Sequence, residues 1–212
     1  MSEMIFEIRI CENCGLRYPI PQGHSFGTRC PHCLGETTLA LQKSIDEEIA
    51  RAGSSVHADH LVVLVDNVRS AWNVGSILRS ADGFGFSHAY LCGITPTPEQ
   101  EAVQKTSLGA EDFVTWSHHK DAVKLVKGLR LEGWKIVGLE EDKRAISLHQ
   151  FAASINQQPV VLIIGNEVTG VDPGLLKLCD EILHIPMHGQ KRSFNVAVAF
   201  GVAAYALRST QT

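Results

Sequence analysis

Short apolar runs alternate with amphipathic segments from Leu61 to the end of the chain. The runs are almost continuous in apolar residues, which is typical of parallel strands buried on both faces. They are LVVLVD (61–66), HAYLCG (88–93), FVTWSH (113–118), WKIVGLE (134–140), VVLIIG (160–165) and EILHIPM (181–187). The segments that predict helices are 74–85, 121–133, 147–154, 172–181 and 193–209. This order predicts an open α/β fold, a parallel sheet with helices on both faces.

The last predicted helix is apolar on nearly all sides over VAVAFGVAAYAL (196–207). A helix of this kind must be buried, either in the centre of its domain or between two subunits. Several of its residues are small, so another helix can approach it closely. The pattern therefore favours a buried helix and is compatible with a homodimer interface along it.

The first fifty residues hold few large apolar side chains but two Cys-x-x-Cys pairs, separated by fifteen residues. Two such turns facing one tetrahedral ion form a zinc ribbon. The expected ligands are Cys11, Cys14, Cys30 and Cys33. Four thiolates complete the coordination, so the zinc is structural and neither His24 nor His32 is needed as a ligand. Gly15 and Gly35 follow the two pairs, where a turn with positive φ is expected.

The boundary between the ribbon and the α/β domain is expected near residue 58. Residues 36–60 are typical of a helical stretch that ends at Gly53 and continues as a polar Ser-Ser linker. The sequence therefore predicts three parts. They are a zinc ribbon over 1–40, a helical linker over 41–58 and the α/β domain over 59–212.

Composition and charge place limits on the partners. The chain has 212 residues, 44% of them hydrophobic and 20% charged, as in an ordinary globular protein. Its net charge of −4 divides into −3 over 1–50, with four Lys and Arg against seven Asp and Glu, and −1 over 51–212. Neither part is a broad polycation, so RNA binding would depend on local clusters. The candidates are Lys191-Arg192, and Arg9, Arg17 and Arg29 of the ribbon.

Two features bear on location. No apolar run approaches the roughly 20 residues that a membrane-spanning helix needs. The N-terminal MSEMIFEIRICENC has acidic residues where a signal peptide is basic. We therefore expect a cytoplasmic protein without a membrane segment, in which paired cysteines bind metal rather than form disulfides. Whether the ribbon binds RNA or a protein stays open.

Residues that could carry chemistry stand directly after strands, where ligands bind in open α/β sheets. After the first strand, Asn73 stands where a helix N-cap belongs and Arg79 follows within the helix. Their simplest interpretation is a cap and an ion pair between Arg79 and Asp82. Before the last helix, Ser193 or Asn195 is expected to be the cap.

The turn Gly165–Gly170 (GNEVTG) follows the fifth strand, and it is neither a G-x-G-x-x-G motif nor a P-loop. A nucleotide ligand would therefore lack a pyrophosphate. S-adenosylmethionine satisfies this restriction, because backbone groups can hold its adenosine and a carboxylate such as Glu167 favours its sulfonium. A plain turn with a solvated Glu167 is the simpler interpretation.

Taken together, three segments resemble the SpoU/TrmH branch of the SPOUT methyltransferases. They are N-x-G-x-x-x-R (73–79), G-N-E-x-x-G (165–170) and I-P-M-x-G…S-x-N-V (185–196), in the family's order. KTSLGAEDF (105–113) is also similar, and the resemblance covers about residues 60–210. It implies a SPOUT-type parallel sheet with a C-terminal trefoil knot, a homodimer, and methylation of a ribose 2′-hydroxyl in tRNA or rRNA.

The resemblance also implies roles for residues. The cofactor-binding positions are Leu139, Gly165, Glu167, Gly170, Ile185, Met187, Ser193 and Phe194. The catalytic positions are Arg79, Asn73, Glu167, Ser193 and Asn195. Arg79 matches the residue that activates the hydroxyl. Arg79 acts either as a base or by stabilising the developing alkoxide. The high pKa of an arginine, above about 12, argues against the base.

Three positions depart from the family's pattern. Arg192 replaces an acidic residue or serine, Phe194 replaces leucine, and Ala197 replaces serine. Phe194 still offers its backbone but alters the adenine pocket, and Arg192 adds a candidate phosphate contact.

Two alternatives to ribose methylation remain. The first is a SPOUT enzyme that modifies an RNA base, against which the SpoU-type motifs argue. The second is a dimeric RNA-binding adaptor without activity. Retention of all five polar catalytic positions argues against the adaptor, because an adaptor needs none of them.

Overall fold

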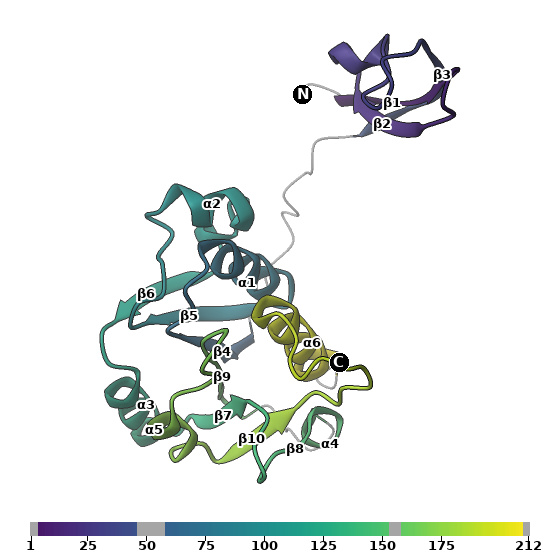
Figure 1. Cartoon of the computed structure of the whole chain (residues 1–212). Helices are drawn as coiled ribbons and strands as arrows, with labels where there is room; N and C mark the ends of the chain where they lie inside the picture. The colour runs from purple at the N-terminus through teal and green to yellow at the C-terminus, as the bar shows by residue number, and fades with distance from the viewer. Residues whose placement is uncertain (1–3, 46–57, 153–157, 210–212) are drawn as a thin grey trace. The chain divides into compact units, whose positions relative to one another are not determined.

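The computed structural model describes residues 4–45, 58–152 and 158–209 (Figure 1). The chain divides into two compact units, Met1–Ser55 and Val56–Thr212. Among the described residues, no helix is long and apolar enough to cross a membrane.

The first unit is a three-stranded antiparallel sheet in the order β2-β1-β3. Its strands are β1 (Met4–Cys11), β2 (Arg17–Pro21) and β3 (Thr37–Ile45). A short 3-10 turn, Ser25–Gly27, lies between β2 and β3. Cys11 ends β1, and Cys30 and Cys33 lie in the turn before β3, which pairs with β1, so the sheet brings the two cysteine turns together.

Residues 37–45 correct a sequence prediction. We expected a helical stretch over 36–60, yet Thr37–Ile45 is a strand that pairs with β1 from Cys11 to Met4. The pattern TTLALQKSI does not decide between helix and strand by itself, and the hydrogen-bonding edge of β1 decides it. The ribbon therefore extends past its predicted border at residue 40. The rest of the predicted linker, 46–57, lies outside the described residues.

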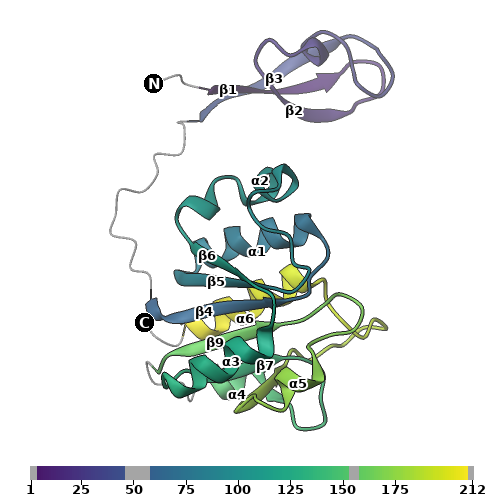
Figure 2. The ribbon, with the colours of Figure 1, turned by 90° about the vertical axis from the view of Figure 1, so that its left-hand side faces the viewer.

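The second unit contains a seven-stranded sheet in the order β6-β5-β4-β9-β7-β10-β8, and every neighbouring pair is parallel. The strands are β4 (Ala58–Asp66), β5 (Phe86–Cys92), β6 (Thr115–His119), β7 (Lys135–Leu139), β8 (Ile146–Ser147), β9 (Val160–Ile164) and β10 (Glu181–His184). Figure 2 shows β6, β5, β4 and β9 side by side in that order. The predicted parallel α/β sheet is confirmed, with the two-residue β8 as an unpredicted addition.

Helices cover both faces of this sheet (Figure 1). They are α1 (Ala71–Gly83), α2 (Glu101–Ser107), α3 (Ala122–Leu131), α4 (Leu148–Ala152), α5 (Pro173–Leu176) and α6 (Val196–Ser209). Helices α1, α4 and α6 pack on one face, whereas α3 and α5 pack on the other. Helix α5 is shorter than predicted, and between it and β10 Asp180 accepts a hydrogen bond from the Ile136 N–H. Helix α2 was not predicted from the apolar pattern.

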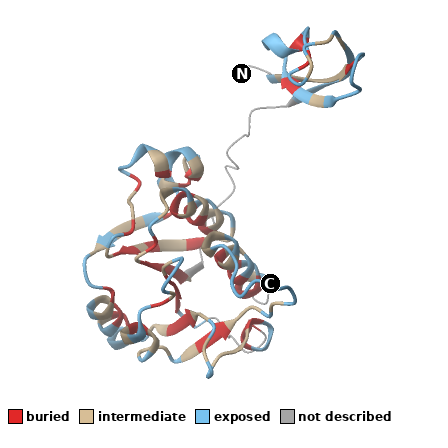
Figure 3. Ribbon diagram, in the orientation of Figure 1, coloured by how far each residue is buried: buried red, intermediate tan, exposed pale blue. Residues whose placement is uncertain are grey.

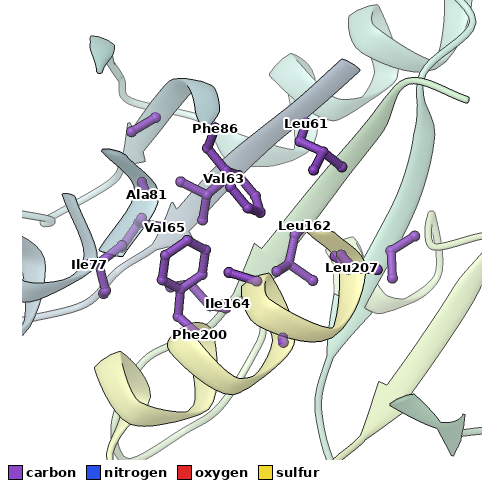
Figure 4. Packing of buried hydrophobic residues seen from close by; sticks show 14 of the residues in the cluster. Leu61, Val63, Val65, Ile77, Ala81, Phe86, Leu162, Ile164, Phe200 and Leu207 are labelled. Atoms are coloured by element: carbon purple, nitrogen blue, oxygen red, sulfur yellow. The ribbon is translucent and has the colours of Figure 1, made fainter. Parts of the chain in front are cut away.

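The core confirms that one side of the last helix is buried within its domain, whereas Val198, Val202 and Tyr205 of the same helix are exposed. Buried residues follow the strands and the inward sides of the helices (Figure 3). Phe200 of α6 is fully buried, and its ring meets the Phe86 ring edge-on at 5.3 Å between centroids. Figure 4 shows Phe200 and Leu207 directed at strand residues such as Val65 and Leu162.

The parallel order has a direct consequence for function. Strands β4, β9, β7 and β10 are consecutive in the sheet, so the segments that follow their carboxyl ends meet at one edge. These segments contain most of the residues singled out from the sequence. The trefoil knot that the resemblance implies stays a prediction.

Candidate functional site

A cavity of about 300 Å³ lies beyond the carboxyl ends of β7, β9 and β10. All eight residues expected to bind the cofactor line it. They are Leu139, Gly165, Glu167, Gly170, Ile185, Met187, Ser193 and Phe194. Asn195 lines it as well. Three chain segments that are far apart in sequence therefore form one concave site.

The turn Gly165–Gly170 forms one wall and depends on its two glycines. Asn166 and Gly170 close the turn through two backbone hydrogen bonds of 2.9 and 3.0 Å. A side chain at Gly165 would collide with the backbone of Gly170 and Val171, and Gly170 has a φ of +71°. Any other residue at either position would therefore deform the wall.

The Asn166 side chain joins this turn to the segment after β4. Its Nδ2 donates to the Asn67 carbonyl at 2.6 Å, and its Oδ1 accepts from the Val168 and Thr169 N–H groups at 2.9 and 3.1 Å. The Asn166 side chain therefore fixes the shape of the turn and also attaches the turn to the segment after β4.

Glu167, Asn73 and Asn195 form a continuous polar chain from the turn to α6. The Glu167 carboxylate accepts hydrogen bonds from the N–H groups of Arg69 and Ser70 at 3.0 and 3.1 Å and from Asn73 Nδ2 at 3.0 Å. Asn195 Nδ2 then donates to Asn73 Oδ1 at 3.0 Å. Four of the five residues expected to be catalytic therefore lie together, because Ser193 is two residues from Asn195 in the same cavity wall.

The caps of the two helices differ in part from the sequence prediction. Ser70, and not Asn73, is the N-cap of α1, where its side chain accepts from the Asn73 N–H. Asn73 lies inside the first turn, which directs its amide toward Glu167. For α6, Asn195 takes the cap position and accepts from the N–H groups of Ala197 and Val198. Ser193 has no part in that cap.

Arg79 stands apart from the cavity. It is exposed on α1, six residues after Asn73 and so about 9 Å further along the helix axis. It does not line the cavity, and within the described residues it forms no ion pair with Asp82.

Two carboxylates near the turn have shifted pKa values of opposite sign. Burial raises the pKa of Glu167, but the hydrogen bonds from Arg69, Asn73 and Ser70 outweigh it and hold the pKa below its ordinary value. For Asp66, which is 2% exposed at the end of β4, burial dominates and raises the pKa. Glu167 is therefore a stable anion at neutral pH.

Several cavity residues were missed from the sequence. They are Glu140, Glu141, Asn166, Val168 and His184. Glu140 follows β7 directly, so the rule that ligands meet strand ends also points to it. Its carboxylate accepts from the Val171 N–H at 2.8 Å, which places it against the glycine turn. Arg192, noted as a departure from the family pattern, also lines the cavity.

A second cluster, in the first unit, has the geometry of a zinc site. The sulfurs of Cys11, Cys14, Cys30 and Cys33 all lie within 4.8 Å of one another. The separations Cys11–Cys33 and Cys14–Cys30 are 3.5 and 3.7 Å, close to the roughly 3.8 Å between thiolates around tetrahedral zinc. Backbone N–H groups of Cys14 and His32 donate to Cys11 and Cys30 sulfurs at 3.4 Å, as in zinc knuckles.

The turns beside these cysteines correct one prediction. Gly15 has the expected positive φ of +73°, but in the second turn Leu34 is left-handed, with a φ of +60°, and Gly35 is not. Gly35 is required for space, because a side chain there would meet Asn13 and the sulfurs of Cys11 and Cys33. His24 caps the Ser25–Gly27 turn and is not a ligand.

Comparison with known proteins agrees with this geometry. A model of the SpoU rRNA Methylase family matches residues 60–205. A tRNA (guanosine(18)-2'-O)-methyltransferase of Thermus thermophilus is 30% identical over 80% of this chain and 82% of its own length. A 23S rRNA (guanosine(2553)-2'-O)-methyltransferase of Bacillus subtilis is 30% identical over 69% of this chain and 57% of its own length.

A solved structure extends the likeness to the fold. The AdoMet-bound rRNA methyltransferase from Sinorhizobium meliloti superposes with a TM-score of 0.65 and 26% identity, over 71% of this chain and 56% of that chain. This chain covers 67%, 54% and 29% of the length of three other relatives. The family match covers most of the second unit, including every segment that builds the cavity. The chain therefore belongs to the SpoU rRNA methylase family.

Proposed function

We propose that this protein transfers a methyl group from S-adenosylmethionine to a ribose 2′-hydroxyl of tRNA or rRNA. One observation carries the proposal. The eight residues expected to bind the cofactor lie up to 55 positions apart in the chain, from Leu139 to Phe194, and they line a single cavity. The names of the relatives, 2'-O-methyltransferases of tRNA and of 23S rRNA, support the ribose hydroxyl as acceptor.

The cavity fits the cofactor in size and chemistry. Its volume of about 300 Å³ lies at the lower end of the range for small-molecule sites. Leu139, Ile185, Met187 and Phe194 give an apolar lining for a base, and three carboxylates on the wall favour a cation. The three carboxylates belong to Glu140, Glu141 and Glu167. When bound, S-adenosylmethionine would supply a methyl carbon attached to a positively charged sulfur, and transfer of that carbon to the ribose oxygen would break the carbon–sulfur bond and release S-adenosylhomocysteine.

The polar chain orients the acceptor side of the site. Asn73 is held between Glu167 and Asn195, so its amide and the start of α1 have a fixed position relative to the cavity. We assign Asn73, Glu167 and Asn195 the task of positioning α1, and Ser193 a polar contact at the cavity wall. Lys191 and Arg192 lie in the exposed segment 188–195, where they can meet RNA phosphates.

Arg79 acts on the hydroxyl in this proposal. Its guanidinium is a cation, so it stabilises the alkoxide that forms as the ribose hydroxyl gives its proton to solvent. Because Arg79 does not line the cavity of its own chain, we propose that it serves the cavity of a second copy.

An apolar stripe on α6 supports a homodimer. Val198, Val202 and Tyr205 are 51%, 39% and 63% exposed, and their spacing places them on one side of the helix. Contiguous exposed apolar side chains mark interaction surfaces. Val198→Glu with Val202→Glu should convert the dimer into monomers in sedimentation velocity. A wild-type chain that is monomeric at the same concentration would contradict the dimer.

The activity is tested with unmodified total RNA and labelled S-adenosylmethionine, followed by nucleoside mapping. We expect label in a 2′-O-methylnucleoside. Label in a base alone would replace ribose methylation with the base-modifying alternative. Cofactor and RNA binding without any incorporation would favour the adaptor.

The role of Arg79 is tested by mixing variants. Arg79→Ala should nearly abolish transfer while cofactor affinity stays almost unchanged. Mixed with Gly165→Val, which blocks the cavity, it should regain about a quarter of wild-type activity, because half the dimers then contain one intact composite site. No recovery in mixed dimers would place Arg79 in the site of its own chain.

The four-cysteine cluster of the ribbon fits a structural zinc and would leave it no open coordination position, so we assign the ribbon to binding rather than chemistry. We assign the chain to the cytoplasm, where thiolates stay reduced and available to zinc.

A further inference from the structure

We propose that Glu140 is a positioning residue that sets the shape of the Gly165–Gly170 turn and thereby the affinity of the cavity for its cofactor. The inference rests on the proposed function for the identity of that cofactor. The contact itself is independent of it, because it joins two parts of this chain.

Both oxygens of the Glu140 carboxylate bind backbone. Oε2 accepts from the Val171 N–H at 2.8 Å, directly after the turn, and Oε1 accepts from the Glu141 N–H at 2.9 Å. An ionised carboxylate is the side chain that has two acceptor oxygens and no donor, so it can accept both hydrogen bonds. Glu140 therefore connects the segment after β7 with the segment after β9.

The same carboxylate occupies the space beside Gly170. A Cβ built on Gly170 would collide with Glu140 Oε2. The glycine and the carboxylate are thus complementary, because the absent side chain leaves the space that the carboxylate fills. Both residues line the cavity, so a shift in their contact moves the wall itself.

A second carboxylate holds the turn from the other side. Asp66, at the end of β4, accepts from the Asp172 N–H at 3.2 Å and from Asn67 Nδ2 at 2.8 Å. Since β9 lies between β4 and β7, the consecutive amides of Val171 and Asp172 are held by carboxylates from the two flanking strands. Asp66 is buried and serves the core as well, whereas Glu140 faces the cavity, which makes Glu140 the residue to test.

Glu141 is the matched control. It lines the same cavity and carries the same charge, but in the described part of the chain its carboxylate accepts no hydrogen bond from the turn. Glu140→Ala removes both the charge and the contact. Glu140→Gln keeps one acceptor oxygen, and Glu141→Ala removes charge alone.

The experiment measures S-adenosylmethionine affinity by titration calorimetry, amide hydrogen exchange of 166–171, and the thermal midpoint of the full chain. Glu140→Ala should weaken affinity by about tenfold and Glu140→Gln by about threefold, since a hydrogen bond to a charged acceptor is lost or halved. Exchange of 166–171 should accelerate in both and stay at the wild-type rate in Glu141→Ala. Equal acceleration in Glu141→Ala, or unchanged affinity in Glu140→Ala, would overturn the inference.

A double-mutant cycle isolates the steric contact between position 170 and the Glu140 carboxylate. Gly170→Ala carries the same backbone strain in any background, but its collision with the carboxylate exists only when Glu140 is present. The loss of affinity caused by Gly170→Ala should therefore be several-fold smaller in the Glu140→Ala background. Additive losses would contradict the contact. If the wild-type chain does not bind the cofactor, the proposed function fails, while the exchange rates still decide whether Glu140 holds the turn.

Discussion

The two units of this chain maintain their structure by different means. In the ribbon, Cys11, Ile20, Gly27 and Cys30 are the only buried residues among those described, and two of them belong to the four-cysteine cluster. In the second unit, apolar clusters fill both faces of a seven-stranded sheet. A small unit with so little buried surface requires a metal, whereas the larger unit is stabilised by apolar burial. The comparison predicts that each unit fails under a different change.

Loss of zinc should have the largest effect, and it should be confined to the ribbon. Structural zinc contributes about 10–16 kcal/mol to small domains, more than an unsupported ribbon can replace. Cys30→Ser should therefore abolish zinc binding and unfold 4–45, measured by metal analysis and by loss of dispersed ribbon amide signals in NMR spectra.

The thermal transition of the second unit should be unchanged in that variant and in a chain that lacks residues 1–50. An unaltered zinc content in Cys30→Ser would show that the ligand set is wrong. Precipitation of the truncated chain would show that the ribbon belongs to the core of the second unit.

A core substitution should give the opposite result. Phe200→Ala removes a fully buried ring that packs against Phe86, at a cost of about 3–5 kcal/mol. The midpoint of the second unit should fall while the zinc content stays the same. Leu131→Ala, at a side chain that is 91% exposed, is the control and should change stability by less than about 0.5 kcal/mol. A parallel loss of zinc in Phe200→Ala would break the comparison.

A polar substitution sharpens the comparison within the second unit. Asn73→Ala removes the hydrogen bonds that connect Asn73 with Glu167 and Asn195. It should lower the free energy of unfolding by about 1–2 kcal/mol, measured by denaturant unfolding. Ser76→Ala, one turn further along α1, removes a hydroxyl that bonds to its own helix and should cost less. Equal losses of stability in the two variants would mean that the hydrogen bonds of Asn73 to Glu167 and Asn195 stabilise the fold no more than a local hydrogen bond within α1.

The smallest effect is the dependence of stability on pH through Glu167. Its folded pKa lies below the ordinary value of 4.5, so its contribution is present above that value and is lost as the pH falls through the folded pKa. Asp66 has the opposite sign, because its raised pKa favours the folded state at low pH. Glu167→Gln should therefore flatten the loss of stability below about pH 4.5, measured by urea unfolding at several pH values. An unchanged profile would contradict the stated cause.

Much of the architecture followed from local pattern. Continuous apolar runs predict the six main strands, because a parallel strand covered on both faces has no polar side. The cysteine spacing predicts the metal cluster, since only a short turn brings Cys11 and Cys14 around one ion. The positions of the motifs directly after strands predict that they form one site, because the carboxyl ends of adjacent parallel strands meet at one edge of the sheet.

What the sequence did not reveal depends on partners distant along the chain. Thr37–Ile45 becomes a strand through pairing with β1. Ser70 and Asn73 both suit a helix cap, and the carboxylate of Glu167 decides which one enters the helix. Glu140 meets Val171 thirty-one positions later, and its side-chain direction has no local signal. Arg79 is exposed on α1 and does not line the cavity of its own chain, and we propose that it acts in a second copy.

The polar chain across the site also governs when the site can form. Its hydrogen bonds join residues 98 positions apart at Glu167 and Arg69, and 122 apart at Asn195 and Asn73. Closing such long segments costs entropy before any contact forms, so these contacts arise late in folding. A chain still in synthesis, or one cut short before residue 195, lacks Asn195 and α6 and therefore has no complete cavity. Binding of the cofactor therefore requires that almost the entire second unit has been synthesised and folded.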